Sequence, residues 1–417
     1  MLTAIEFFDK TPLENVISVL TTVPDKIIFI GDGKDMRRFD GIYRTFLEKR
    51  GLTVMLEYRP VQRNNITMLV EELSAIVEAE ERCVFDLTGG DDLALVAVGM
   101  VYQKYRDEKP MQLQRLNVLN GVVTDCDSDG EIVGTDKPTI SVEENICLHG
   151  GVIRYEEEGH AGTYAWELTA DFVEDVELLW SVCRENPGLW NAQLNVLGAM
   201  SLFTYDDDPL SICVDLGVLQ DYAQSHGINY VEVHELLQFF NAYGLIEDLE
   251  DDGRRVIFAY KNRQIKRCLS KAGTVLELKV FITARQLTAK DGTAYYTDSM
   301  SGVFIDWDGN LHTRQDEEKD TENEIDVVLM QGLRPVFISC KNGQVDDDEL
   351  YKLDAVTNRF GGRYAKKVLV ATYLGKNGRS MEHFRQRAAD MKIHLVDGVH
   401  EQDDAQFAKM VKHLING

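Results

Sequence analysis

The sequence of 417 residues has few cysteines and lacks a long hydrophobic run. No apolar stretch approaches the roughly 20 residues of a membrane-spanning helix. The N-terminus has no basic region followed by an apolar core and a cleavage site, so secretion is not indicated either. The seven cysteines are scattered and never in C-x-x-C spacing, which supports neither a disulfide framework nor a zinc site. We therefore expect a cytoplasmic protein with no membrane partner.

The sequence also lacks the short motifs of several common protein classes. It contains no nucleophile elbow, H-E-x-x-H pair, EF-hand loop or P-loop. The G-x-G-x-x-G motif of dinucleotide-binding proteins is missing after the first expected strand. The nine histidines are dispersed, and none has metal-ligand spacing to another. None of these classes is therefore indicated.

Positive charge is scarce, because 44 basic residues face 70 acidic ones and give a net charge of −26. At first sight this argues against a nucleic-acid partner, since phosphate contacts need lysine and arginine. Residues 253–271, however, hold seven basic residues and no acidic one: Arg254, Arg255, Lys261, Arg263, Lys266, Arg267 and Lys271. Two interpretations stay open, a solvated basic face and a surface that guides a substrate.

The first 118 residues alternate between strand and helix patterns. Strands are expected at 4–9, 26–30, 53–58, 82–87 and 113–119, with helices between them at 11–20, 35–49, 64–78 and 91–105. The second strand is continuously apolar, as strands covered on both faces are. The pattern predicts a doubly wound, Rossmann-like sheet, whose ligands bind beyond the carboxyl ends of the strands.

Three strand-to-helix junctions of this sheet carry candidate ligand-binding residues. These are Asp9, Lys10 and Thr11; Gly31 and Asp32; and Thr88, Gly89, Gly90 and Asp91. In the third junction two glycines expose backbone N–H groups at a helix N-terminus and a threonine adds a hydroxyl, which favours a cradle for phosphate or ribose. A tight turn without a ligand is the alternative, and it is favoured for the second junction.

The middle of the chain predicts two further parts. Residues 120–164 are rich in Gly, Asp and Thr and indicate a short β-extension of the first sheet. Residues 168–265 are mostly helical, and the helices expected at 215–225 and 230–243 precede a hairpin, which is a winged-helix-like order. Either this module reads DNA or it is a structural connector or dimer interface. The acidic hairpin tip, residues 248–252, would repel phosphate.

Two strand-like runs near the C-terminus, residues 323–328 and 335–343, read as a hairpin around a turn with Gly and Pro. Because strand side chains alternate, Ser339 and Lys341 share one face. Asp326 on the first strand and Lys341 on the second can then converge, which is the layout of a metal-dependent phosphodiesterase site. The helix expected before the hairpin, up to about residue 286, carries Glu277 among apolar neighbours, where a carboxylate needs a partner.

A helix at 346–360 and a strand at 366–372 follow. This order, with an acid on the first helix, resembles the core of the PD-(D/E)xK nucleases. Residues 4–15 (AIEFFDKTPLEN) and 84–92 (VFDLTGGDD) resemble the two ligand loops of a CARF domain, the sensor of type III CRISPR systems. The whole chain is similar to the CRISPR-associated nucleases that cyclic oligoadenylate activates.

The resemblance implies an α/β protein of three domains. They are a Rossmann-like CARF domain with its β-extension at 1–165, a winged-helix-like helical connector at 166–268 and a restriction-endonuclease-like domain at 269–417. It further implies a homodimer that binds one cyclic oligoadenylate, expected to be cyclic tetra-adenylate, across its two-fold axis. The expected substrate is single-stranded DNA or RNA, or a duplex that is nicked.

The resemblance also implies the roles of the site residues. Glu277 and Asp326 would hold Mg²⁺ or Mn²⁺ with help from the carbonyl of Cys340, and Lys341 would orient the attacking water. One position departs from the family pattern, because Ser339 stands where Asp or Glu is expected two residues before the lysine. A hydroxyl is a poorer ligand than a carboxylate for a hard cation.

Another acid could replace the missing carboxylate. Glu324 is the first candidate, because it lies two residues before Asp326 and shares its strand face, and Asp306 and Glu349 are the others. Two alternatives to the ligand-activated nuclease stay open. One is a ligand-gated regulator that binds nucleic acid and keeps a degenerate nuclease domain, and the other is a restriction or repair nuclease without a ligand.

Overall fold

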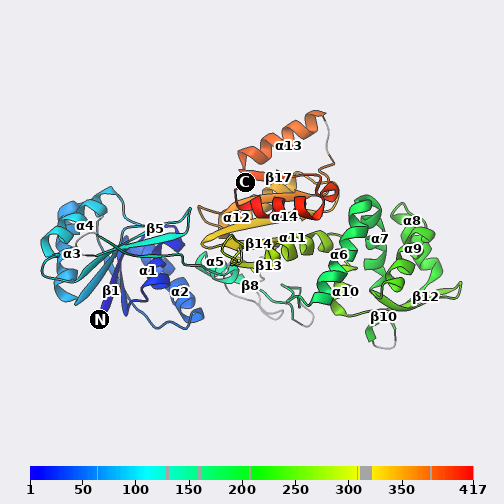
Figure 1. The fold of residues 1–417 in the computed structure, drawn as a ribbon, viewed down its shortest axis with the longest axis horizontal. Helices are drawn as coiled ribbons and strands as arrows, with labels where there is room; N and C mark the ends of the chain where they lie inside the picture. The colour runs from blue at the N-terminus through cyan, green and yellow to red at the C-terminus, as the bar shows by residue number, and fades with distance from the viewer. Residues whose placement is uncertain are drawn as a thin grey trace.

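The computed structural model describes residues 1–62, 64–127, 131–157, 161–205, 208–307, 309, 322–375 and 378–416. The molecule is elongated, and its C-terminal domain lies between the N-terminal domain and the helical connector (Figure 1). Two hydrophobic clusters join these parts: one combines the connector with the C-terminal domain, and the other combines the N-terminal and C-terminal domains. None of the described helices has both the length and the apolar character that a membrane span requires.

The N-terminal domain is built on a seven-stranded sheet of order β3-β2-β1-β4-β5-β6-β7. Its first five strands are parallel, and β6 and β7 extend it in antiparallel pairing. The predicted Rossmann-like sheet is thereby confirmed. The strands are β1 (Leu2–Phe7), β2 (Lys26–Gly31), β3 (Met55–Pro60), β4 (Arg82–Asp86), β5 (Met111–Asn117), β6 (Val122–Cys126) and β7 (Ile132–Asp136). The helical segments are η1 (Pro12–Asn15), α1 (Ile17–Thr21), α2 (Gly33–Lys49), α3 (Ile66–Ala79) and α4 (Asp92–Tyr105).

Alternating side chains of the central strands enter two different cores. Ile27 and Phe29 of β2 belong to the cluster that contains Tyr43 of α2, whereas Ile28 belongs to the cluster that contains Leu73 of α3. Helices therefore cover both faces of the sheet, as its apolar strands require. Helices α2, α3 and α4 begin at the polar caps Asp32, Asn65 and Asp91, which fix where the junctions before them end.

The segment after β7 joins the C-terminal domain. It contains α5 (Val142–Leu148) and β8 (Val152–Ile153), and Ile153 pairs with Ile305 of the C-terminal sheet. The predicted β-extension is present as β6 and β7, but the expected boundary at residue 165 does not coincide with a boundary between the sheets. The reason is burial: Ile146 and Ile153 are covered by the same cluster as Val303.

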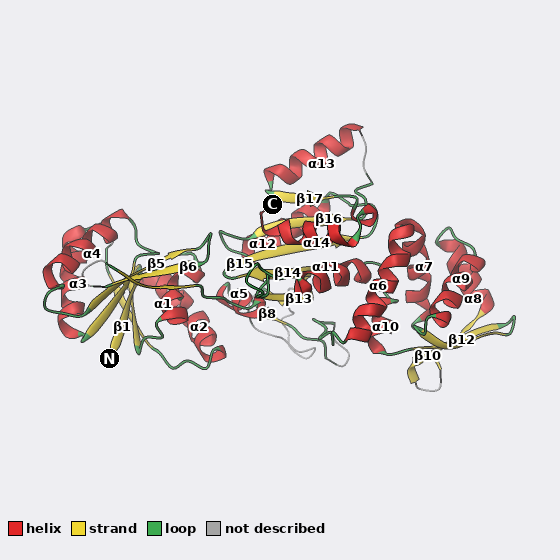
Figure 2. Ribbon diagram, viewed as in Figure 1, coloured by secondary structure: helices red, strands yellow, loops and turns green. Residues whose placement is uncertain are grey.

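The connector combines helices with a four-stranded sheet of order β11-β12-β10-β9 (Figure 2). The helix pair α8 and α9 is followed by the hairpin β11–β12, which confirms the predicted winged-helix-like order. Its helices are α6 (Ala170–Glu185), α7 (Pro187–Met200), α8 (Leu216–Ser225), α9 (Tyr230–Ala242) and α10 (Arg263–Cys268). Its strands are β9 (Thr204–Tyr205), β10 (Asp208–Asp215), β11 (Ile246–Asp251) and β12 (Arg255–Tyr260).

The C-terminal domain has a mixed six-stranded sheet of order β17-β16-β15-β14-β13-β8. The predicted hairpin is β14–β15, and pairing of Gln331 with Arg334 leaves a two-residue turn in which Gly332 has φ +63°. The strands are β13 (Asp298–Asp306), β14 (Glu322–Gln331), β15 (Arg334–Lys341), β16 (Lys366–Ala371) and β17 (Ile393–Val396). The helical segments are α11 (Thr274–Gln286), α12 (Asp348–Phe360), α13 (Gly378–Asp390), η2 (Val399–Glu401), α14 (Asp404–His413) and η3 (Leu414–Asn416).

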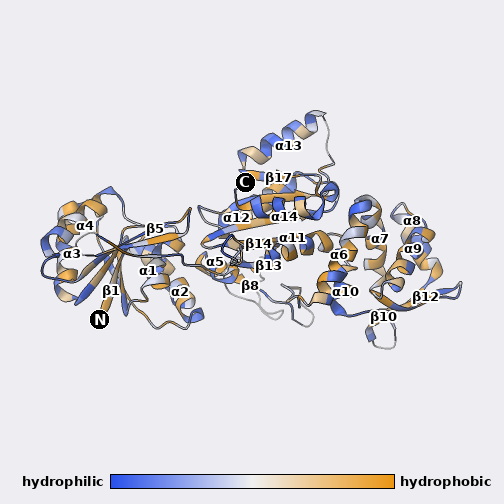
Figure 3. Ribbon diagram, in the orientation of Figure 1, coloured by the Kyte–Doolittle hydropathy of each residue, from blue (hydrophilic) through white to orange (hydrophobic). Residues whose placement is uncertain are grey.

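Helices α11 and α12 lie on opposite faces of this sheet. Val327 and Ile338 share a cluster with Leu276 of α11, whereas Val328 shares one with Leu353 of α12. Helix α11 is hydrophobic on most sides (Figure 3) and is buried throughout residues 274–284. A helix of this kind forms only when neighbours surround it. It therefore holds its buried polar side chains, Glu277 among them, in fixed positions.

Candidate active site

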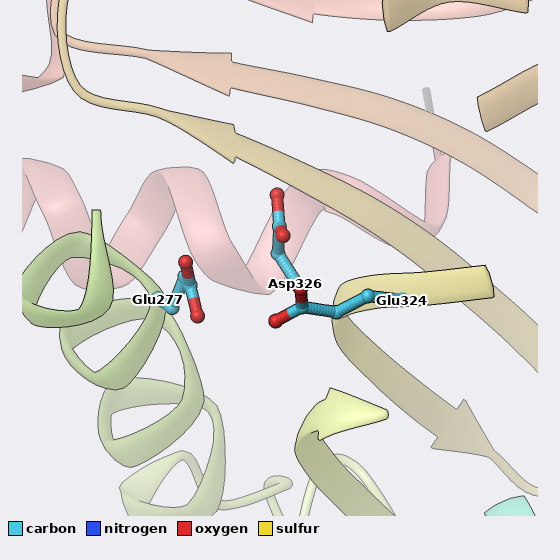
Figure 4. A group of neighbouring side chains, drawn as sticks. All are labelled: Glu277, Glu324 and Asp326. Atoms are coloured by element: carbon cyan, nitrogen blue, oxygen red, sulfur yellow. The ribbon is translucent and has the colours of Figure 1, made fainter. Parts of the chain in front are cut away.

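Three carboxylates converge between α11 and β14 (Figure 4). Oxygen atoms of Glu277, Glu324 and Asp326 all lie within 4.8 Å of one another. Glu324 and Asp326 are two residues apart on β14 and so point to the same face of the sheet. Helix α11 contributes Glu277 to the same place, so elements separated in sequence complete the cluster.

Burial makes two of these carboxyl groups weaker acids than usual, because it raises their pKa values. Glu277 is 5% exposed and Asp326 is 8% exposed, whereas Glu324 is exposed. Burial, followed by the charge of Asp326, raises the pKa of Glu277 to about 8. Burial also raises the pKa of Asp326. Ionised carboxylates in such a place require nearby cations, because an isolated buried charge is costly.

Two lysines supply positive charge to the cluster. The Nζ atom of Lys271 lies 2.9 Å from Oε1 of Glu324 and 3.7 Å from Oε1 of Glu277. The Nζ atom of Lys341 lies 3.6 Å from Oδ2 of Asp326 and 2.9 Å from Oε2 of Glu349. Burial alone lowers the pKa of Lys341, but Asp326 and Glu349 outweigh it, so the pKa is raised and the ammonium stays charged.

The neighbouring strand fixes Asp326. Ser339 Oγ donates a hydrogen bond of 3.2 Å to Oδ2 of Asp326, and the backbone N–H of Cys340 donates one of 2.7 Å to the same oxygen. Ser339 therefore lies at the cluster as predicted, as a donor to a carboxylate. A donor pair of this kind holds the carboxylate in one orientation and favours its charged form.

Of the three acids considered as replacements for the missing carboxylate, Glu324 joins the described cluster. Asp306 is fully buried on β13 and accepts a hydrogen bond from the N–H of Gly309. Glu349 pairs with Lys341 and with Lys352. Of the three, Glu324 is thus the acid that lies beside Glu277 and Asp326.

Lys271 is the site residue that the sequence did not single out. It was grouped with the basic residues of 253–271, since its contact with Glu277 depends on how the chain enters α11. The available signal was indirect: a buried glutamate needs a cation, and Lys271 is the nearest basic residue before Glu277.

Much of the remaining basic segment is paired inside the molecule. Lys261 lies 2.7 Å from Asp175, and Arg267 pairs with Glu156 and stacks on the ring of Tyr164. Lys266 donates to backbone carbonyls. These side chains are thus engaged within the protein, which speaks against a surface that guides substrate and also against a basic face that is only solvated.

The third junction of the N-terminal domain is closely packed. A Cβ atom on Gly89 would lie 2.4 Å from the carbonyl oxygen of Phe7, so only glycine fits where β1 and β4 end together. Thr88 Oγ1 accepts a hydrogen bond from Leu116, and Asp91 caps α4. A cavity of about 580 Å³ opens beside this junction, and Thr88 and Gly90 line it.

The other two junctions lie outside the lining of this cavity. Asp9 Oδ1 accepts a hydrogen bond from the N–H of Thr11, and Lys10 is exposed. Asp32 follows Gly31 and caps α2 by accepting from two backbone N–H groups. These contacts agree with the turn that was favoured for the second junction.

Comparison with known proteins identifies the C-terminal domain. Residues 272–413 match the family model of the Card1-like endonuclease domain. The predicted nuclease domain is confirmed over these residues, and the three carboxylates and Lys341 all lie within the Card1-like part. Lys271 immediately precedes it.

Two solved structures share the fold of the whole chain. Protein VC1899 from Vibrio cholerae is 20% identical with a TM-score of 0.69, and the match covers 100% of this chain and 97% of that one. Can2 from Sulfobacillus thermosulfidooxidans, solved in complex with cyclic tetra-adenylate, is 16% identical with a TM-score of 0.61 and the same coverage. No match was found among curated protein sequences.

Proposed function

We propose that the chain is a metal-dependent endonuclease, activated by a cyclic oligoadenylate, that acts as a homodimer in the cytoplasm. The observation that carries this proposal is the convergence of Glu277, Glu324 and Asp326 beside Lys341, in a domain that matches an endonuclease family.

The three carboxylates suit a hard divalent cation such as Mg²⁺ or Mn²⁺, which prefers oxygen ligands. Glu277, Glu324 and Asp326 would hold it, with the carbonyl of Cys340 as a further ligand. A bound cation would polarise the phosphodiester and lower the pKa of a water molecule. The third carboxylate comes from Glu324, so Ser339 need not be a ligand.

The residues around the three carboxylates would position Asp326, orient the attacking water and balance the negative charge. Ser339 and the N–H of Cys340 hold Asp326 in one orientation. Lys341 stays protonated and would donate a hydrogen bond to the attacking water. Its positive charge would also stabilise the negative charge that develops on the phosphate oxygens. Lys271 balances the charge of Glu277 and Glu324.

We assign the activator to the cavity beside β4. Thr88 and Gly90 line it and would bind phosphate or ribose there. Gly89 and Asp91 belong to the same junction. The other predicted ligand residues, Asp9, Lys10, Thr11, Gly31 and Asp32, lie on neighbouring strand ends outside this lining and would meet only parts of the ligand that extend beyond the cavity. The likeness in fold to Can2, which was solved with cyclic tetra-adenylate, supports this choice of ligand.

A homodimer is supported by an apolar face on α4. Leu93, Val96 and Met100 recur at helical spacing and are 41%, 51% and 54% exposed. A two-fold axis suits a ring ligand, because each protomer then meets the same edge of the ring.

The proposed substrate is single-stranded DNA or RNA. The test is incubation with plasmid, single-stranded DNA and RNA in Mn²⁺, with and without cyclic tetra-adenylate. Cleavage that requires both metal and activator is expected. Cleavage without the activator would favour a nuclease that needs no ligand. No cleavage with any substrate, despite tight ligand binding, would favour the regulator with a degenerate site.

A further inference from the structure

The cavity beside β4 has walls from two domains. Thr88, Gly90 and Arg115 line it from the N-terminal domain, and Arg363 and Tyr364 line it from the C-terminal domain. Arg363 and Tyr364 directly follow the two glycines that end α12. The ligand site proposed for the sensor is therefore incomplete without the nuclease domain.

The loop that carries Arg363 is held against the N-terminal domain. Tyr364 OH donates a hydrogen bond of 3.1 Å to Oε1 of Glu14, and Glu14 is 6% exposed. Gly362 has φ +67°, a conformation that ends the helix and turns the chain toward the cavity.

Two arginines at this cavity form no direct ion pair with a described residue, although Glu14 also lines the cavity and the charge of Arg363 acts to lower the pKa of Glu14. Arg363 stacks on the ring of Tyr364, and within the described part of the chain neither Arg363 nor Arg115 forms an ion pair. Both are exposed. Guanidinium groups bind phosphate through paired charge-assisted hydrogen bonds. The two side chains together favour an anionic ligand with more than one phosphate.

The other end of α12 reaches the catalytic lysine. Glu349 in its first turn lies 2.9 Å from Nζ of Lys341. The helix is about 20 Å long at 1.5 Å per residue. Leu350, Leu353 and Val356 are almost fully buried against the sheet, so the helix can move only as a unit.

We propose that Arg363 binds a phosphate of the activator, and that α12 couples the occupied cavity to Lys341 through Glu349. Lys341 divides its contacts between Glu349 and Asp326. A shift of α12 changes the first contact and thus the position of the ammonium group at the carboxylate cluster. The identity of the ligand rests on the proposed function. The role of Arg363 can fail while the proposed function still holds.

The first test measures the affinity for cyclic tetra-adenylate by calorimetry in wild type, Arg363→Ala, Arg363→Lys and Arg385→Ala. Arg385 is an exposed arginine on α13 that does not line the cavity, and it is the matched control. Arg363→Ala should weaken binding by about tenfold or more and Arg363→Lys by less, with Arg385→Ala unchanged. Melting curves check that every variant folds.

The second test is Glu349→Gln, which keeps the shape of the side chain and removes its charge. It should still bind cyclic tetra-adenylate, with a change in Kd no larger than the coupling itself, but show a smaller ratio of activated to basal cleavage. Wild-type affinity in Arg363→Ala overturns the proposal about Arg363 while leaving the proposed function standing. An unchanged activation ratio in Glu349→Gln overturns the coupling through α12. Absence of any binding to wild type overturns the proposed activator and this inference together.

Discussion

Ser339 and Glu324 together determine how the active site could hold a metal ion. Ser339 contacts Asp326 from β15, and Glu324 provides a carboxylate from the same face of β14. A hard cation gains much more from a carboxylate than from a hydroxyl. In the proposed metal site the third ligand would therefore come from β14 instead of β15, and the number of carboxylates would stay the same.

The first prediction separates these two residues. Glu324→Gln should lower kcat/KM in Mn²⁺ by roughly 100-fold or more, because it removes a metal ligand. Ser339→Ala should lower it by about tenfold or less, because it removes one of two donors to Asp326. Steady-state cleavage of single-stranded DNA measures both. The reverse order of effects would contradict the assignment of Glu324.

The second prediction concerns the charge of Lys271. Lys271 lowers the pKa of Glu277, which burial and Asp326 raise to about 8. Metal ions compete with protons for this carboxylate, so the affinity for Mn²⁺ should rise as the pH increases toward 8. Lys271→Met removes the opposing charge and should move this rise to higher pH. Calorimetric titration with Mn²⁺ at a series of pH values measures it, and identical pH profiles would contradict the role of Lys271.

At the scale of elements, strand β4 carries a buried acid. Asp86 is fully buried and accepts a hydrogen bond from the N–H of Thr88. Burial raises its pKa to about 7, whereas an unfolded chain has a value of about 3.9. The folded state therefore keeps a proton that the unfolded state loses in this range. The contribution of Asp86 to stability is present below about pH 4 and is lost as the pH rises to about 7.

The third prediction follows from this loss of stability with rising pH. Between about pH 5 and pH 7 the melting temperature of wild type should fall more than that of Asp86→Asn, which has no proton to lose. Glu6, paired with Asp86 across β1 and β4, also has a raised pKa and leaves a smaller slope in the variant. Thermal melting at both pH values measures the difference. Equal changes in the two proteins would show that Asp86 is ionised in the fold.

Elements with strong periodicity could be predicted from the sequence, and those that depend on distant contacts could not. All six residues of β2 are buried, so its apolar run was a clear signal. The two-residue strand β8 has no pattern of its own, because its pairing with β13 exists only after the domains meet. In the site, the positions of Asp326, Ser339 and Lys341 could be predicted from strand alternation, and that of Glu277 from its place on a helix. The contact of Lys271 with Glu277 could not, because it depends on the path of the loop before α11.

At the scale of the whole molecule, the proposed two-fold axis passes beside α4. The fourth prediction is that Val96→Glu with Met100→Glu converts a dimer into a monomer, because both side chains are exposed and apolar and would face their copies. Light scattering after size exclusion measures the mass. An unchanged dimer would place the interface elsewhere, and a wild-type monomer, with or without cyclic tetra-adenylate, would contradict the homodimer.

The central claim is that one acidic cluster with Lys341 performs cleavage under control of a separate ligand site. It is tested by comparing wild type, Asp326→Asn and Lys341→Ala with Glu250→Gln, an exposed acid on β11, as the control. Cleavage of single-stranded DNA and RNA is measured in Mn²⁺ with cyclic tetra-adenylate, alongside the Kd of the activator. We expect Asp326→Asn and Lys341→Ala to lose activity by several orders of magnitude without loss of activator binding. Metal-dependent cleavage that survives both substitutions would contradict the account.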